Sequence, residues 1–415
     1  MRAASLLLVL VGCGDGVTLP DATTVTDAAE RGLVTFRYKK PTSTANDRII
    51  FQNADSTIAL VTRVNAAGEA SALMAPGGFV SVYDGPPSSN ILYTWTNVQP
   101  GDVITLDLTF DRFGEAVPNA SVRIDPLDGA EGYFIFNRCE SFVDASFAIT
   151  EPFAPFFQPC TPTSDLLLVA RDPLGRSIGY RFASDANLQT TGTIDLRGTY
   201  SPFDATIEVT GPSDTIVSVQ SQLAGVFYVT GTSAQITGTT VSVPITMPVA
   251  ANATAQTSVR TLSTGLEEDD AQPSELTTIV WGPATKVTTA DLSTPRIRTF
   301  ASTPTFDLES YELRWTENDD GERGDVVWAQ FGLVGFQWKV IGRRTDETAL
   351  RLPVLPYEGL RPISETIFLD NFALITAEGG YDRLRTYLLG HWDPSNGNTW
   401  PMNEPSGRVN FRSLR

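Results

Sequence analysis

VTRVNAAGEASALMAPGGFVSVY, residues 61–83, and NVQPGDVITLDL, residues 97–108, decide the fold class of this chain. Apolar and polar residues alternate in both stretches at a period of two, which is the spacing of a strand with one buried face. Turn residues separate the alternating runs: Asn-Ala-Ala-Gly at 65–68, Pro-Gly-Gly at 76–78 and Pro-Gly at 100–101. Short alternating runs between such turns predict strands packed as a β-sandwich.

The same alternation continues through the rest of the chain. It is rich in β-branched and aromatic residues, as strands are, and recurs at 34–38, 58–61, 166–169, 311–315 and 326–331. The nearest approach to a helical pattern is 382–389, one or two turns long. We therefore expect an all-β fold of three to four β-sandwich units in series, of the Ig-like or prealbumin-like type.

The turns of the deciding stretch resemble those of a known module. Carboxypeptidase-regulatory-like and prealbumin-like seven-stranded domains place an Asx-Ala-x-Gly-x-Ala turn between two strands, then a returning Pro-Gly, then Gly-Asp before a last strand. The matching positions here are 65–70, 76–77 and 101–102. The resemblance covers 32–111, about a fifth of the chain. It implies a β-sandwich used for ligand contact, spacing or scaffolding, and it carries over no catalytic residue.

The remaining chain divides by composition into further β units. We expect a unit at 112–200, a Thr/Ser/Val-rich unit at 201–290 and a Trp-rich unit at 291–415. The two middle units could also be halves of one larger sandwich. No internal repeat can be aligned among the four.

The chain begins with the features of an export signal. Arg2 precedes an apolar run from Leu6 to Val11, and Leu-Val-Gly-Cys follows at 10–13, in the charged, apolar, small-residue order of such signals. The last four residues resemble the lipobox of bacterial lipoproteins, which implies cleavage after residue 12 and acylation of Cys13. Residues 13–31 are then a lipidated tether, and Gly14 favours an outer-membrane destination. The alternative is an ordinary signal peptide with an incidental cysteine.

The cysteine count agrees with lipidation. Of three cysteines, Cys13 is set aside as the lipid site, and Cys139 and Cys160 remain as an even pair. In an exported chain we expect these two to form a disulfide. The net charge of −18 argues against nucleic acid as a partner, because binding there depends on clustered Lys and Arg.

Two tryptophans are the first candidates for ligand contact. Trp392 and Trp400 lie in HWDPSNGNTWPMNEP, a polar segment that does not pack as a strand. Exposed aromatic faces suit sugar rings and protein partners. The competing interpretation is that these rings are core, as alternation with Leu313 predicts for Trp315.

An acidic segment between two predicted strands could hold calcium. Asp319, Asp320 and Asp325 would offer the hard oxygen ligands that Ca²⁺ prefers. The segment does not fit the EF-hand register, and Asp-Asp-Gly between strands is first a hairpin turn. We expect no other cofactor.

No catalytic constellation stands out. Residues 175–179, Gly-Arg-Ser-Ile-Gly, match the nucleophile-elbow string, which requires a strand before the serine and a helix after it. Here an Asp-Pro-Leu-Gly turn precedes Ser177, and the residues after Ser177 alternate as a returning strand. His391 is the sole histidine, so a multi-histidine metal site is excluded.

The sequence thus favours a non-enzymatic cell-envelope lipoprotein that acts as a binding or scaffold module. Its partners would be the membrane, through the lipid anchor, and envelope proteins or polysaccharide. An outward-facing carbohydrate-binding or adhesive protein is the alternative. A hydrolase with an unrecognised carboxylate site is the third hypothesis, because acidic residues are abundant but no motif selects two of them.

Overall fold

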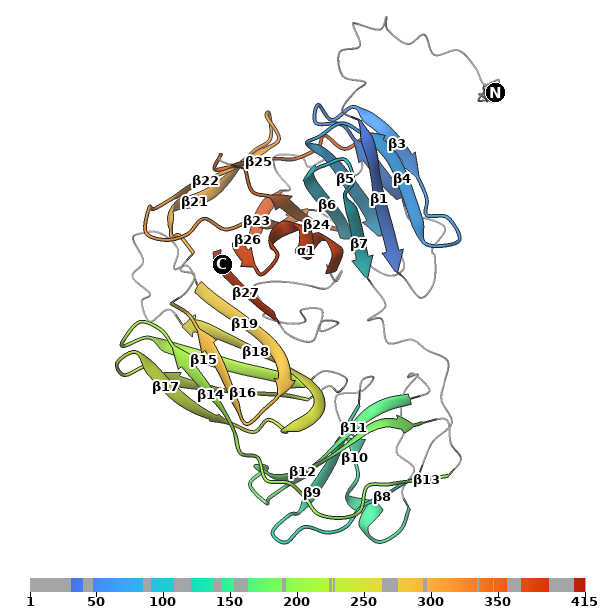
Figure 1. Cartoon of the computed structure of the whole chain (residues 1–415), viewed down its shortest axis with the longest axis vertical. Helices are drawn as coiled ribbons and strands as arrows, with labels where there is room; N and C mark the ends of the chain where they lie inside the picture. Colours follow the sequence, from blue (N-terminus) through green and yellow to red (C-terminus); the bar gives the residue numbers. More distant parts are fainter. Residues whose placement is uncertain are drawn as a thin grey trace, which may run out of the picture.

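The computed structural model describes residues 31–39, 48–84, 91–107, 121–137, 143–152, 163–188, 192–223, 226, 228–262, 275–293, 297–333, 336–345, 347–356, 367–387 and 407–414. Within these ranges the regular structure is almost entirely β-strand (Figure 1). The helical elements there are a short 3-10 helix, η1 (Ser146–Ile149), and one α-helix, α1 (Gly380–Tyr387). The expected all-β class is confirmed.

The first strand group contains seven strands: β1 (Gly32–Lys39), β2 (Arg48–Gln52), β3 (Ile58–Thr62), β4 (Glu69–Met74), β5 (Gly78–Asp84), β6 (Ile91–Val98) and β7 (Val103–Asp107). One sheet has the order β4-β1-β7, and the other contains β3-β2-β5-β6. β1 is antiparallel to β4 and parallel to β7. Val34 and Phe36 of β1 share a buried cluster with Phe51 and Trp95 from the opposite sheet, so the two sheets pack face to face.

The turns of this group form as their residues predict. The Asn65 side chain accepts hydrogen bonds from the Ala67 and Glu69 amides at 2.9 and 3.0 Å. Gly68 adopts φ +76° in this turn, a left-handed conformation that suits glycine. Before β7, Asp102 Oδ2 accepts a hydrogen bond of 2.8 Å from the Gln99 amide. Local side-chain hydrogen bonds of this kind fix where each strand ends.

The third strand group repeats this pairing order. Its strands are β14 (Ala205–Thr210), β15 (Ile216–Leu223), β16 (Val229–Gln235), β17 (Thr240–Ile245), β18 (Ala250–Leu262), β19 (Glu275–Ala284) and β20 (Val287–Asp291). The orders are β17-β14-β20 and β16-β15-β18-β19. β14 to β20 thus occupy the positions that β1 to β7 have in the first group. β14 is antiparallel to β17 and parallel to β20, as β1 is to β4 and β7.

The second group follows the same order in part. It comprises β8 (Ser121–Arg123), β9 (Gly132–Phe136), β10 (Val143–Asp144), β11 (Thr163–Arg171), β12 (Ser177–Asn187) and β13 (Thr193–Asp195). Its sheets are β10-β9-β11-β12 and a parallel pair, β13-β8. Its side chains Phe136, Leu167 and Val169 share a buried cluster with the third group, so the two groups pack against each other.

The fourth group ends the described chain. Its strands are β21 (Phe300–Asp307), β22 (Glu312–Glu317), β23 (Val326–Leu333), β24 (Phe336–Arg343), β25 (Ala349–Arg351), β26 (Phe368–Ala377) and β27 (Gly407–Leu414). β24-β23-β26-β27 are neighbours in that order, and β21-β22-β25 form a separate sheet. β22 to β27 occupy the positions that β1 to β6 have in the first group. β21 takes the place of β7, but it pairs antiparallel with β22, whereas β7 pairs parallel with β1.

Three of the four-stranded sheets join edge to edge into one sheet of twelve strands. β24 pairs parallel with β6, and β19 pairs antiparallel with β27. Strands from 32–111, 201–290 and 291–415, the ranges expected as separate units, therefore belong to one hydrogen-bonded sheet. Backbone pairing between strands far apart in the chain leaves no local sequence signal. The division of the chain by composition therefore could not show that these ranges share a sheet.

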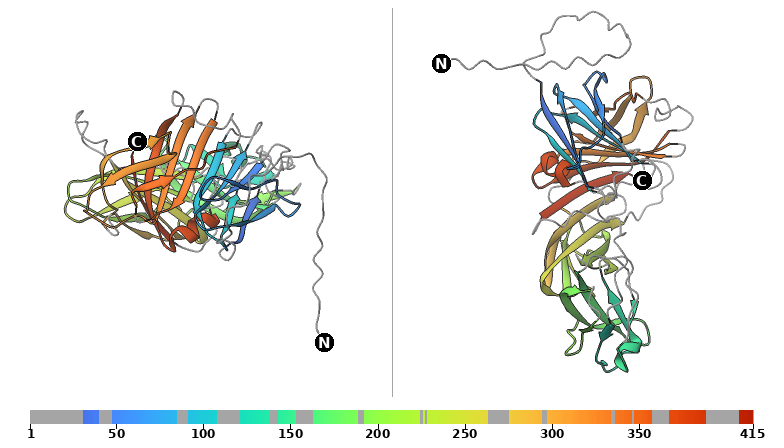
Figure 2. Two further views of the ribbon diagram at one scale, coloured as in Figure 1. Left: turned by 90° about the horizontal axis from the view of Figure 1, so that it is seen from above. Right: turned by 90° about the vertical axis from the view of Figure 1, so that its right-hand side faces the viewer.

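The largest buried cluster contains side chains from all three of the joined strand groups. The cluster that holds Phe36 and Trp95 also holds Trp281, Trp328 and Phe411 from the third and fourth groups. Figure 2 shows the molecule elongated, with the second group at one end and the first and fourth groups together near the other. In the ranges described, no helix has the length and apolar character needed to cross a membrane.

Candidate functional site

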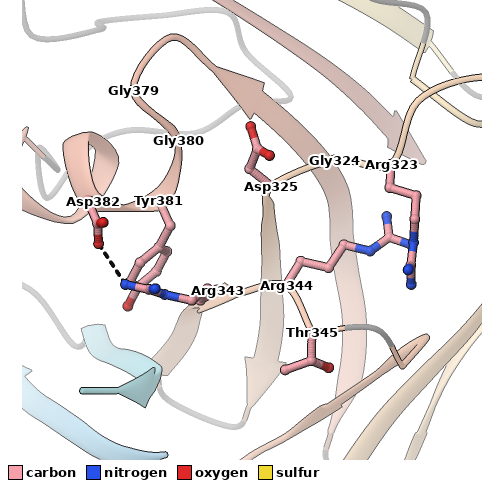
Figure 3. A pocket seen from close by; sticks show the side chains of 10 residues that line it. All are labelled: Arg323, Gly324, Asp325, Arg343, Arg344, Thr345, Gly379, Gly380, Tyr381 and Asp382. Atoms are coloured by element: carbon pink, nitrogen blue, oxygen red, sulfur yellow. Dashed lines mark hydrogen bonds and ion pairs between the residues drawn. The ribbon is translucent and has the colours of Figure 1, made fainter.

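An open pocket of about 480 Å³ lies in the fourth group, where three elements meet. Figure 3 shows Asp325 just before β23, Arg343 and Arg344 at the end of β24, and Tyr381 and Asp382 at the start of α1. Arg323, Gly324, Thr345, Gly379 and Gly380 complete its lining. Strand ends and a helix start carry unpaired backbone groups, which makes such a junction suitable for polar contacts.

Two consecutive glycines let the chain turn from β26 into α1. Gly379 and Gly380 both have positive φ, +83° and +61°, a conformation that other residues adopt only at a cost. The turn exposes Asp382 in the first helical turn, where a carboxylate is favoured by the helix dipole. Asp382 Oδ1 accepts a hydrogen bond of 2.6 Å from Arg343 Nη2 (Figure 3).

The first strand group holds α1 in place. The buried Tyr381 donates a hydrogen bond of 3.4 Å to the Thr96 carbonyl of β6. Arg385 forms an ion pair with Asp102, and the two side chains are 14% and 5% exposed. Burial raises the pKa of Tyr381, and the negative charge of Asp102 adds to this effect. The helix start that lines the pocket is therefore fixed by residues of the first strand group.

Arg344 contributes a buried charge beside the pocket. Its Nη2 lies 2.6 Å from Glu317 Oε1, and the two side chains are only 3% and 2% exposed. Trp315 Nε1 donates a hydrogen bond of 2.5 Å to the same carboxylate oxygen. Burial lowers the pKa of Arg344, while the bond to Glu317 opposes that shift and the charges of Arg323 and Arg298 add to it. A buried ion pair of this kind fixes geometry more than it stabilises the fold.

Asp325 is the second acidic residue that lines the pocket. Although the residue is exposed, the protein around its carboxyl displaces enough water to raise its pKa. The Ala377 amide donates a hydrogen bond that opposes this shift, whereas the charge of Glu322 adds to it. The backbone of Asp325 is fixed by a hydrogen bond of 2.7 Å to the Ile375 carbonyl.

The pocket combines guanidinium donors with carboxylate acceptors around an open space. Such a set can orient a ligand that carries both hydroxyl and charged groups. Its charged side chains are Arg323, Arg343, Arg344, Asp325 and Asp382, and Arg343 and Asp382 lie next to each other as an ion pair. Because charges of both signs line the pocket, we expect it to hold a polar ligand through hydrogen bonds rather than to attract a single ion.

The three acidic residues proposed as calcium ligands have separate partners. Asp319 Oδ1 lies 2.5 Å from Arg298 Nη2. Asp320 accepts hydrogen bonds from the Thr299 amide and hydroxyl at 2.9 and 2.8 Å. Asp325 lines the pocket. Within the described part of the chain, no three His, Cys, Asp or Glu residues are grouped as metal ligands would be.

Several candidate residues lie outside the described ranges. These are Cys13, Cys139, Cys160, His391, Trp392 and Trp400. The lipidation, disulfide and aromatic-platform predictions that depend on them stay predictions.

The serine of the Gly-x-Ser-x-Gly string lies on a strand, as its alternation predicts. Ser177 begins β12, which pairs antiparallel with β11 across the turn at 172–175. Asp172 caps this turn by accepting hydrogen bonds of 2.9 Å from the Leu174 and Arg176 amides. No helix follows the serine, so this segment does not form a nucleophile elbow. Trp315 is 4% exposed, which confirms its predicted place in the core.

Sequence reasoning missed the pocket itself. Two signals were present: adjacent arginines directly after an alternating strand, and a Gly-Gly pair directly before the short helical pattern. Neither feature alone marks a site. Only the antiparallel pairing of β23 with both β24 and β26 brings the two segments together.

Comparison with known proteins gives no family. No protein-family model and no curated protein matches the chain. One solved structure, titled "The Bacillus anthracis TIE protein", is 11% identical over 63% of this chain and 50% of that chain, with a TM-score of 0.15. A similarity at that level carries no argument about fold or function.

Proposed function

We propose that this protein is a non-enzymatic cell-envelope lipoprotein that acts as a binding or scaffold module. The observation that carries the proposal is the joining of three four-stranded sheets into one twelve-stranded sheet. Strand groups linked only by flexible connections would reorient independently, whereas hydrogen-bonded edges hold β6 against β24 and β19 against β27. A body of this kind keeps its surfaces at fixed separations, which suits a scaffold.

The proposal includes the architecture of the four groups as β-sandwich units, of which the first is prealbumin-like. It is supported by the seven-strand order of β1–β7, with a parallel first and last strand. The same order in β14–β20 and its partial recurrence in the other two groups support a series of related units. Modules of one topology repeated along a chain are common in extended binding proteins.

The anchor is tested by acylation. We propose that Cys13 carries the lipid and that the protein is held at the outer membrane. Cells labelled with a palmitate analogue should yield a labelled wild-type protein and an unlabelled Cys13→Ser variant. Cys139→Ser is the matched control and should keep the label. Equal labelling of Cys13→Ser would exclude lipidation at this residue, while leaving the scaffold role open.

The binding role is tested with the soluble protein beginning at Gly14. Saturable retention on peptidoglycan or envelope polysaccharide, measured with and without calcium, would support a glycan-binding module. Trp392→Ala with Trp400→Ala tests the aromatic segment, and Arg343→Ala tests the pocket. Retention that both variants leave unchanged would remove both candidate sites.

The outward-facing carbohydrate-binding function is the second candidate, and the pocket is the observation that favours it. Sugar hydroxyls need donors and acceptors side by side, and Arg343 and Asp382 offer both on fixed elements. An acidic oligosaccharide should bind wild type more tightly than Arg343→Ala in calorimetry. Arg37→Ala, which removes an exposed arginine of β1, is the matched control.

A further inference from the structure

Among the described strands, β16 is an unpaired edge of the twelve-stranded sheet. It pairs with β15 through seven consecutive residues without a bulge. No other described strand pairs with its outer side. All seven of its residues, Val-Thr-Gly-Thr-Ser-Ala-Gln, are uncharged, none is proline, and most are exposed. A free edge of this kind presents a row of unpaired backbone groups to another strand.

Three other edge strands of the described chain, β3, β4 and β17, carry features that discourage pairing. β3, at the opposite end of the same sheet, is short and has a bulge opposite Phe51 and Gln52. β17 contains Pro244, and β4 carries the exposed ion pair of Glu69 with Arg37. Bulges, prolines and charges are the usual protection of sheet edges. Of the two edges of the twelve-stranded sheet, β16 is therefore the one suited to extension, because it has no bulge, proline or charge.

The chain itself shows how such edges join. β19 and β27 hold the same position in their groups, as sixth strands in the shared pairing order. They pair antiparallel through seven residues, so two edges of the same kind meet around an approximate two-fold axis. β16 is the third strand of its group and forms an edge of the sheet. It can pair with β16 of a second molecule in the same manner, because a two-fold interface uses one surface twice.

We propose that β16 of one molecule pairs antiparallel with β16 of a second molecule, extending the sheet across a symmetric dimer. Pairing all seven residues places the two-fold axis at Thr232, the centre of the strand. Thr230 then lies opposite Ala234 of the second copy, and Val229 lies opposite Gln235. Val229, which is 46% exposed, becomes covered. Thr232 lies beside the buried Val219 of β15, so the new pair continues the core-facing side of the sheet.

The charge of the two molecules gives the dimer a salt dependence. Each chain carries a net charge of −18, so two copies repel each other at low ionic strength. The uncharged β16 adds nothing to this repulsion. Salt screens charges beyond about 8 Å at 0.15 M, so association should strengthen as salt is raised to that level.

Cross-linking tests the register. In the full chain purified in detergent, Thr232→Cys should form a disulfide between two copies under mild oxidation, because directly opposite residues lie roughly 4.5–5.5 Å apart. Thr230→Cys is the matched control. Its two copies would lie four residues apart along the strands, roughly 13 Å, beyond the reach of a disulfide. The wild-type chain gives the background from its own cysteines.

Sedimentation analysis tests the interface. Wild type should be dimeric, and Thr232→Lys, which places like charges at the axis, should lower the association constant at least tenfold. Thr193→Lys, on the exposed strand β13, should leave it unchanged. All three should unfold at the same temperature when diluted until each is monomeric, because association itself raises the unfolding temperature. A monomeric wild type at about 100 µM, equal cross-linking of the two cysteine variants, unchanged dimerisation of Thr232→Lys, or open-ended polymers would each overturn the proposal.

Discussion

The substitution Thr94→Val should weaken the joint between the first and fourth strand groups. Thr94 lies on β6, and its hydroxyl accepts a hydrogen bond of 2.9 Å from Trp338 Nε1 on β24. The same hydroxyl shares a hydrogen bond of 2.9 Å with the Ser81 hydroxyl of β5. Ser81, Thr94 and Trp338 are all fully buried. Valine keeps the shape of threonine and removes both hydrogen bonds.

The magnitude follows from the two groups that lose their partners. A buried donor or acceptor left without a partner costs roughly 1–3 kcal/mol. Thr94→Val leaves the Trp338 indole N–H and the Ser81 hydroxyl in that state, so we expect a loss of about 3 kcal/mol in the free energy of unfolding. Water cannot replace these bonds unless the joint between β6 and β24 opens.

Urea denaturation followed by tryptophan fluorescence and circular dichroism measures the loss. Trp338→Phe in the Thr94→Val background removes one orphaned donor, so a double-mutant cycle should give a coupling energy of about 1–2 kcal/mol between the two residues. Thr35→Val, at a partly exposed threonine on β1, is the control and should change stability by less than about 0.5 kcal/mol. A loss for Thr94→Val as small as the control's would refute the reasoning.

Three further changes have expected outcomes. Arg344→Ala should destabilise the protein by about 3–5 kcal/mol in thermal unfolding, because it leaves Glu317 charged and buried; full stability would contradict the buried pair. Asp325 has a raised pKa in the folded protein, so its ionisation weakens folding as pH rises. Asp325→Asn should therefore have a larger free energy of unfolding than wild type at neutral pH, and the two should become equal below pH 3.8, the ordinary aspartate pKa. A difference in the free energy of unfolding that does not change with pH would exclude this effect. Gly342→Ala should cost about 1–3 kcal/mol, since its Cβ would collide with Thr96 Oγ1 across the joint; unchanged stability would show that β24 can shift.

Local sequence patterns predicted the strands because alternation and turn chemistry act over a few residues. The run at 34–38 lies within β1, and those at 166–169 and 326–331 lie within β11 and β23. The helical pattern at 382–389 overlaps α1. Asn65 and Asp102 end strands through hydrogen bonds to residues two to four positions away. Such contacts are encoded where they occur.

The joined sheet and the pocket could not be predicted in this way. The pairing of Thr94 with Val340 joins residues far apart in the chain, and a strand with a partner on one side looks the same in sequence as a strand with partners on both. The recurring strand order is equally hidden, because many sequences satisfy one pattern of pairing. The pocket depends on Arg343 and Asp382 meeting, which only the completed sheet brings about.

Hydrogen–deuterium exchange measured by mass spectrometry tests the joined sheet most directly. β6 and β24 lie side by side within the sheet, whereas β3 is a free edge of the same first group. We predict that the amides of β6 and β24 exchange slowly and at similar rates, far more slowly than those of β3, because their shared hydrogen bonds open only when the two strands separate. If β6 exchanges as fast as β3 while the rest of the first group stays protected, the groups are not joined, and the rigid scaffold proposed here is contradicted.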